Sequence, residues 1–249
     1  MRKIAYIVIF IMISLLFPGM IYADSYTVND DELTISFEDP SWVVFTRDNL
    51  KDNEQLKKLG TDEKTMLATM EKSYAYVVAV KGGAKKRIEL LVRVTDNEYI
   101  NNMNTLSESE MAALKEGVDE NYSGELDEYE SAITEMGEQR YIQMTGRYDK
   151  DDYDVVQYLT FVNGENYLIS AQKVIEFTAE DLEQIDEIVA NAEFRIDPSK
   201  TENDVDSYVK ERQASLSSGQ KSTPVKIAIT AIVVVVIILL LKLKNRRRK

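Results

Sequence analysis

Apolar and polar residues alternate along several short segments of the chain, which predicts β-strands. The first two strands are expected at 33–37 and 42–45, on either side of a Glu-Asp-Pro-Ser turn. Two more are expected at 74–80 and 87–95, joined by a loop that contains two glycines. Along the last of these, apolar and polar positions fall on opposite faces: Ile88, Leu90, Val92 and Val94 on one, Arg87, Glu89 and Arg93 on the other.

Three further strands are expected as a meander at 139–148, 155–162 and 166–174. Asn163-Gly164 joins the last two, and Asn-Gly between β-rich segments is the strongest short hairpin signal. The segment 155–162 is apolar on both faces, so we expect a central strand that is covered on each side.

Helical spacing of apolar residues appears between these strands. The Thr-Asp-Glu sequence at 61–63 begins one helix, and Gly60 ends a shorter one before it. Ser107 and Glu110 form a capping-box pattern at the start of the next helix. An amphipathic helix is expected after Thr178.

A short edge strand is expected at 192–196, after the last of these helices. The predicted fold class is therefore α+β, a mostly antiparallel β-sheet flanked by helices. Pro198 closes the pattern, so the folded domain is expected at 24–198. The polar segment 199–224 predicts a linker, part of which has a weak helical pattern and would form a stalk.

The two ends of the chain carry its longest apolar runs. Residues 1–23 combine a basic start, an apolar stretch and a small residue at Ala23, which predicts a secretory signal peptide, with an uncleaved anchor as the alternative. Residues 225–243 predict a transmembrane helix, because at 1.5 Å per residue they would reach about 28 Å. The basic tail at 244–249 is expected in the cytoplasm, where it would touch anionic lipid.

These segments predict a single-pass protein of the plasma membrane, with its N-terminal domain outside and its C-terminus in the cytoplasm. We expect the envelope of a Gram-positive bacterium. Membrane lipid would be contacted through the C-terminal helix and the basic tail.

The composition excludes several classes of function. The 249 residues include no cysteine and no histidine, so disulfides, thiolate or imidazole metal sites and a Ser-His-Asp triad are excluded. Residues 24–224 hold all 43 acidic side chains and 21 of the 30 basic ones. A surface of this charge argues against nucleic acid as a partner.

The remaining candidate chemistry is weak. Ser170 and Lys173 fit the Ser-x-x-Lys pattern of a nucleophilic dyad, but in a strand this spacing places them on opposite faces. Four aspartates crowd one hairpin, where a solvated turn is the favoured interpretation and a calcium site the alternative: Asp149, Asp151, Asp152 and Asp154. We therefore expect no catalytic, cofactor-binding or metal-binding residues and no cofactor.

Four tyrosines are candidate contact residues, because they fall in or beside predicted loops: Tyr122, Tyr129, Tyr148 and Tyr153. Tyrosine offers a large contact area with a polar tip. The alternative is that these rings pack along the ends of strands.

The order of these elements, beginning with Phe37 and the Pro-Ser-Trp sequence at 40–42, resembles the PsbP-like superfamily over residues 30–197. The family pattern near the first strand is Phe-Pro followed by Trp, whereas here Glu38 and Asp39 separate Phe37 from Pro40. This α/β/α sandwich is shared by the photosystem II extrinsic subunit P, a nuclear-transport GTPase-binding protein and many bacterial exported proteins. The resemblance implies a binding or assembly-support module without common catalytic residues.

Three classes of function follow from these observations. The leading one is a membrane-anchored, extracytoplasmic, non-catalytic binding or sensing module that presents an acidic surface to a protein or small ligand. The second is an accessory or assembly subunit of a larger membrane complex. The third is a hydrolase that works without histidine or cysteine.

Overall fold

The computed structural model describes residues 24–30, 32–83, 86–123, 126–148, 153–174, 176–200 and 202–217, with side chains to residue 211. The predicted signal peptide, transmembrane helix and basic tail lie outside these residues. Within the described ranges, none of the helices has the length and apolar character that a membrane crossing requires.

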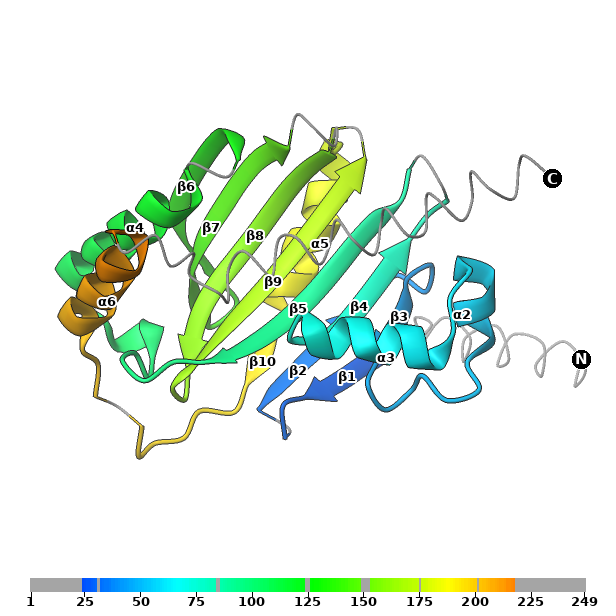
Figure 1. The fold of residues 1–249 in the computed structure, drawn as a ribbon, viewed down its shortest axis with the longest axis horizontal. Helices are drawn as coiled ribbons and strands as arrows, with labels where there is room; N and C mark the ends of the chain where they lie inside the picture. The colour runs from blue at the N-terminus through cyan, green and yellow to red at the C-terminus, as the bar shows by residue number, and fades with distance from the viewer. Residues whose placement is uncertain are drawn as a thin grey trace, which may run out of the picture.

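Seven antiparallel strands form the large sheet (Figure 1). In spatial order they are β3 (Val43–Thr46), β4 (Ala75–Lys81), β5 (Ile88–Asp96), β9 (Glu165–Val174), β8 (Tyr153–Val162), β7 (Gln139–Tyr148) and β6 (Asp127–Met136). This sheet confirms the predicted α+β class. β8 is buried at every position except Asp154, as expected for a central strand covered on both faces.

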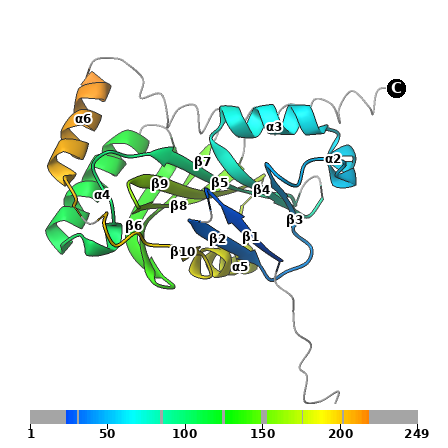
Figure 2. The ribbon, with the colours of Figure 1, turned by 90° about the horizontal axis from the view of Figure 1, so that it is seen from below.

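A second, smaller sheet and one helix cover one face of the large sheet (Figure 2). The small sheet has the order β1 (Asp24–Val28), β2 (Leu33–Phe37) and β10 (Glu193–Phe194), and α5 (Ala179–Ala190) lies beside it. The short strand expected at 192–196 is therefore present as β10, paired with β2. Ile88, Leu90, Val92 and Val94 all join this core cluster, as their shared face predicted.

Helices cover the opposite face of the large sheet at its two ends (Figure 1). α2 (Glu54–Leu59) and α3 (Glu63–Lys72) pack with β3, β4 and Leu91 of β5 in one cluster. The 3₁₀ turn η1 (Met103–Thr105), α4 (Glu108–Tyr122) and α6 (Val205–Ser217) pack with β7, β8 and β9 in another. The apolar side chains on this face thus form two separate clusters.

The helix boundaries follow the capping signals in the sequence. Asp62 accepts a hydrogen bond from the backbone N–H of Thr65, and Gly60 ends α2 with a φ of 78°. Ser107 and Thr178 each form a capping box, at the start of α4 and α5. These caps confirm the predicted starts and ends.

α6 lies within the segment predicted as a linker and changes how that segment is understood. Val205 and Tyr208 are buried, and the ring of Tyr208 meets Phe161 of β8 edge-on, with 5.5 Å between ring centroids. A Cβ at Gly117 of α4 would lie 3.4 Å from Val209, so the two helices approach closely. The weak helical pattern is therefore a packing face, and the folded part continues through α6 instead of ending at residue 198.

Two strands were missed from the sequence, β1 and β6. β6 is an edge strand in which no position is fully buried, and its sequence is rich in acidic side chains. An edge strand of this kind lacks the apolar alternation that marks a strand with one buried face. The predicted three-strand meander is therefore a four-strand one, with β6 paired to β7.

Candidate binding face

A row of polar side chains crosses the large sheet between the two helix clusters. They come from the face opposite α5, and we call them the polar strip: Arg87, Glu89, Arg93, Gln157, Ser170 and Gln172. Arg87 directly precedes β5 and keeps 16 % of its side chain exposed, whereas the other five are buried. Buried polar groups carry a desolvation cost unless they are paired, so their partners show what the strip can do.

Strand register brings residues of the polar strip together from three strands. Glu89 of β5 lies opposite Gln172 of β9, and the Gln172 Nε2 donates to the Glu89 carboxylate over 3.0 Å. Ser170 lies opposite Gln157 of β8, whose Nε2 donates to the Ser170 hydroxyl over 3.1 Å. Arg87 adds an ion pair with Glu89 at 3.6 Å.

Burial shifts the titration of the charged groups of the polar strip. Desolvation raises the pKa of Glu89, against the opposing effects of the Gln172 hydrogen bond and of Arg87. Desolvation lowers the pKa of Arg93 to about 10, and the nearby Tyr122 and Tyr148 oppose that shift. Arg93 therefore stays protonated at neutral pH. The strip holds two guanidinium groups and one carboxyl in a domain that is otherwise strongly acidic.

Arg87 and Gln157 of the polar strip each have an unsatisfied polar atom. In the described part of the chain, Nε of Arg87 and Oε1 of Gln157 are buried and have no hydrogen-bond partner. Leaving a buried polar group unpaired costs about 1–3 kcal/mol. A donor and an acceptor are therefore left on a face that the apolar clusters border on both sides.

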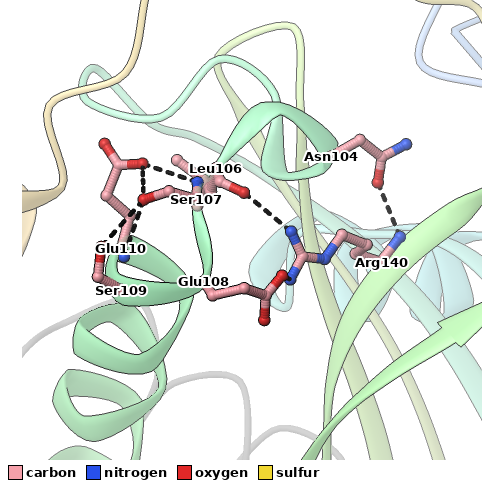
Figure 3. A network of polar contacts seen from close by, with 7 residues as sticks. All are labelled: Asn104, Leu106, Ser107, Glu108, Ser109, Glu110 and Arg140. Atoms are coloured by element: carbon pink, nitrogen blue, oxygen red, sulfur yellow. Dashed lines mark hydrogen bonds and ion pairs between the residues drawn. The ribbon is translucent and has the colours of Figure 1, made fainter.

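The start of α4 is fixed by Arg140 of β7 (Figure 3). Its guanidinium donates to the carbonyl of Leu106 and to the carboxylate of Glu108, each over 2.9 Å. The backbone N–H of Arg140 donates to the Asn104 side chain over 2.8 Å. This network ties η1 and the N-terminus of α4 to the sheet.

The four candidate tyrosines are more enclosed than expected. Tyr122 and Tyr153 are only 5 % and 6 % exposed, and the rings of Tyr148 and Tyr153 lie 4.7 Å apart. The hydroxyl of Tyr129, which is on β6, donates to Asp119 of α4 over 2.7 Å. Tyr122 and Tyr153 therefore follow the alternative given for these residues, in which the rings pack at the ends of strands, whereas Tyr129 and Tyr148 are partly exposed. A role in ligand contact remains a prediction.

The Ser-x-x-Lys pattern does not form a dyad. Ser170 lies in the polar strip, whereas Lys173 reaches the opposite face and forms an ion pair with Asp181 at the start of α5. The pattern drew attention to Ser170 for a chemistry that the fold does not provide. Gln157 and Gln172 were missed, although a glutamine inside the apolar segment 155–162 was a visible signal.

The aspartate-rich hairpin is described only at one of its four carboxylates. Asp154 forms an ion pair with Arg147 at 2.6 Å and accepts from the backbone N–H of Phe177. Asp149, Asp151 and Asp152 lie outside the described residues. Among the residues that are described, no group of three or more acidic side chains is arranged to hold a metal ion.

Comparison with known proteins finds likeness in structure alone. No family model matches the sequence, and no curated protein matches it. Cyanobacterial PsbP (CyanoP) from Synechocystis sp. PCC 6803 is similar at 11 % identity and a TM-score of 0.43, over 72 % of this chain and 95 % of that one. A protein from Bacteroides thetaiotaomicron VPI-5482 is similar at 11 % identity and a TM-score of 0.38, over 69 % of this chain.

The chain spans about half of the Bacteroides protein, 48 % of its length. At this identity no functional residue passes from either structure to this chain.

Proposed function

We propose that this chain is a membrane-anchored, extracytoplasmic binding module without catalytic activity, and that the polar strip is its binding face. The observation that carries the proposal is the pair of unsatisfied buried atoms on Arg87 and Gln157, among the described residues, between two apolar clusters. A ligand that pairs with them would remove their desolvation cost.

Stability alone does not account for the polar strip. Apolar side chains at these positions would join the α3 and α4 clusters into one continuous core. Replacing buried polar pairs with apolar groups of similar shape is often neutral or stabilising. Residues that break a local rule without a structural gain are expected at functional sites.

The chemistry of the polar strip favours binding over catalysis. The hydroxyl of Ser170 is paired with the amide of Gln157, which cannot accept a proton as a general base. Glu89 is paired with Gln172 and Arg87. The strip therefore offers hydrogen bonds and charge without an activated nucleophile.

The membrane part of the proposal rests on the sequence. The apolar runs at 1–23 and 225–243 support export and anchoring, and the basic tail supports the orientation. The acidic side chains of residues 24–224 would keep the domain off anionic lipid and present an acidic surface around the strip.

Photo-crosslinking of the full-length chain in its native membrane tests this proposal. A diazirine amino acid replaces Leu91, which lies directly beside Ser170 in the sheet. The matched control carries the same group at Glu183, an exposed residue of α5 on the opposite side. We expect adducts at position 91 that are absent at position 183, identified by mass spectrometry.

The same experiment separates the alternatives. Identical adducts at both positions, or none at position 91, would remove the strip as the binding face. A single envelope protein captured in equal amount to this chain at position 91 would favour the accessory-subunit function.

A further inference from the structure

The two edges of the large sheet differ in how their backbone groups are paired. β3 is one edge strand, and the side chain of Asn49 closes it. The Asn49 Nδ2 donates to the carbonyl of Val44 over 3.1 Å, and its Oδ1 accepts from the backbone N–H of Thr46 over 2.9 Å. β6, the other edge strand, is ten residues long and pairs with β7 alone in the described part of the chain. The chain therefore closes one edge itself and leaves the other open.

The hairpin register shows which backbone groups of β6 point outward. Met136 and Gln139 flank a two-residue turn and pair with each other, so they exchange backbone hydrogen bonds. Because such pairs alternate along an antiparallel ladder, the N–H and C=O groups of Ser131, Ile133 and Glu135 point away from β7. Within the described ranges, no hydrogen bond from another element reaches these groups. β6 thus offers three donors and three acceptors, spaced as a further strand would need them.

Charge determines what can pair with this edge. β6 and its turn carry exposed acidic side chains and no basic one: Asp127, Glu128, Glu130, Glu135 and Glu138. Arg140 of β7 lies opposite Glu135, but its guanidinium donates to Leu106 and Glu108 instead. A second copy of β6 would bring the same charge, and like charges oppose such pairing. The open edge therefore favours a strand with basic side chains.

We propose that the outer edge of β6 is a docking surface for an extended, basic segment of a partner protein, which adds to the large sheet as a further strand. Its backbone would bond to Ser131, Ile133 and Glu135, and its basic side chains would lie opposite Glu130 and Glu135. These two glutamates are five positions apart in the strand, so they face opposite sides of the sheet.

The matching segment therefore carries two basic residues that are separated by four others. The basic tail at 244–249 has the required charge, but the proposed topology places it across the membrane from β6. The docking edge lies two strands beyond β8, so it is separate from the polar strip and goes beyond the proposed function.

Synthetic peptides and the full-length protein in phosphatidylcholine nanodiscs test this proposal. The probe is a C-amidated peptide of threonine and valine with a neutral fluorophore and two lysines separated by four residues, and its Kd is measured by anisotropy. In one matched peptide the lysines are separated by three residues, which places both on one side of the strand. We expect its Kd to be about two- to fivefold higher, because one opposite-charge pair is lost. A second matched peptide has glutamates in place of the lysines and should not bind.

Charge reversal on the protein tests where the peptide lies. Glu130→Lys combined with Glu135→Lys should raise Kd for the lysine peptide at least about tenfold, and it should create binding of the glutamate peptide. Glu63→Lys combined with Glu71→Lys is the matched control. It makes the same change in charge at exposed residues of α3, which packs at the other end of the large sheet. Its Kd should equal that of the unaltered protein.

Backbone methylation of the peptide separates strand pairing from attraction by charge alone. N-methyl groups on alternate residues leave the side chains unchanged and remove every second N–H. Of the two possible phases, one removes the N–H groups that face β6 and should raise Kd at least about tenfold. The other phase should bind as the parent peptide does. This comparison needs no protein variant, so it remains decisive if the double lysine variant fails to fold.

Several outcomes would overturn the proposal. They are no binding of the lysine peptide, equal affinity for the two lysine spacings, equal affinity for the two methylated peptides, and an unchanged Kd in the variant of Glu130 and Glu135. A second copy as the occupant is tested with Ala132→Cys, because the chain has no cysteine of its own. Disulfide-linked pairs that form without peptide would place β6 of another copy on this edge and would also overturn the proposal.

Discussion

The two faces of the large sheet are built in different ways. On the α5 side, one continuous apolar cluster joins the small sheet, the sheet residues such as Leu90 and the helix residue Ile185. On the other side, the α3 cluster and the α4 cluster are separated by the polar strip. The apolar core of the first face is unbroken, whereas that of the second face is divided in two.

Under the proposed function, this difference separates stability from binding within one sheet. The continuous face has the alternation and helix pattern that a core requires. The interrupted face keeps charged and amide groups where leucine or valine would pack more favourably. Substitutions of core residues on the α5 side should therefore lower the free energy of unfolding strongly. Substitutions in the polar strip should change it little.

The largest effect is expected on the continuous face. Leu90→Ala removes a fully buried side chain and should lower the free energy of unfolding by about 2–5 kcal/mol, through lost burial and a cavity. Denaturation of the full-length protein can be followed by fluorescence of Trp42, the single tryptophan, which lies in this cluster. A loss below about 1 kcal/mol would contradict the view that this face is a closely packed core.

Arg140 tests whether its network holds the start of α4 on the sheet. Arg140→Ala removes the hydrogen bond to the Leu106 carbonyl and should cost about 1–2 kcal/mol. Glu108→Ala is the control: it removes only the ion pair, whose carboxylate is 88 % exposed, and should cost less than about 0.5 kcal/mol. Equal losses in the two variants would show that the bond to Leu106 contributes nothing.

Glu89 gives a prediction in pH. Its pKa is raised in the folded protein, so the folded state binds this proton more tightly than the unfolded state. Stability from this group is therefore greater at low pH and falls as pH rises from the ordinary glutamate pKa through the raised one. Glu89→Gln should gain stability relative to the unaltered protein as pH is raised from 4 to 8.

The other carboxylates are the same in both proteins, so subtracting the free energy of unfolding of the unaltered protein from that of Glu89→Gln isolates the effect of this group. Denaturation of both proteins at pH 4 and at pH 8 measures this difference. If Glu89→Gln instead lost stability relative to the unaltered protein as pH rises, the pKa of Glu89 would be lowered in the folded protein.

The smallest change in stability is expected in the polar strip itself. Gln157→Leu removes an acceptor that is unsatisfied in the described structure, while it also removes a donor to Ser170. These effects offset, so the free energy of unfolding should change by less than about 1 kcal/mol in either direction. A loss as large as that of Leu90→Ala would make the strip a structural element and weaken its assignment as a binding face.

The same comparison explains how far the sequence predicts this molecule. Local signals placed β5, the capping boxes of α4 and α5 and the central strand β8, because alternation and caps act within a few residues. β6 was missed because an acidic edge strand has little burial to mark it. The packing of α6 was missed because its partner α4 lies far away in the chain.

The polar strip could not be predicted from local sequence signals either, because its residues are far apart in the chain. Glu89 and Gln172 are 83 residues apart in the chain, and only the pairing of β5 with β9 makes them neighbours. The sequence placed Arg87, Glu89 and Arg93 on one face of a strand. It had no means to show that Gln157 and Ser170 would complete that row from two other strands.

The packing of α6 on α4 has a mechanical consequence. α6 is the last described element, so a load applied to the chain beyond residue 217 reaches the sheet through this helix. α6 adds no strand to either sheet, and its buried contacts begin at Val205 and Tyr208. Tension from that end would separate α6 from α4 before any strand of the sheet separated, so α6 would be the first element to detach.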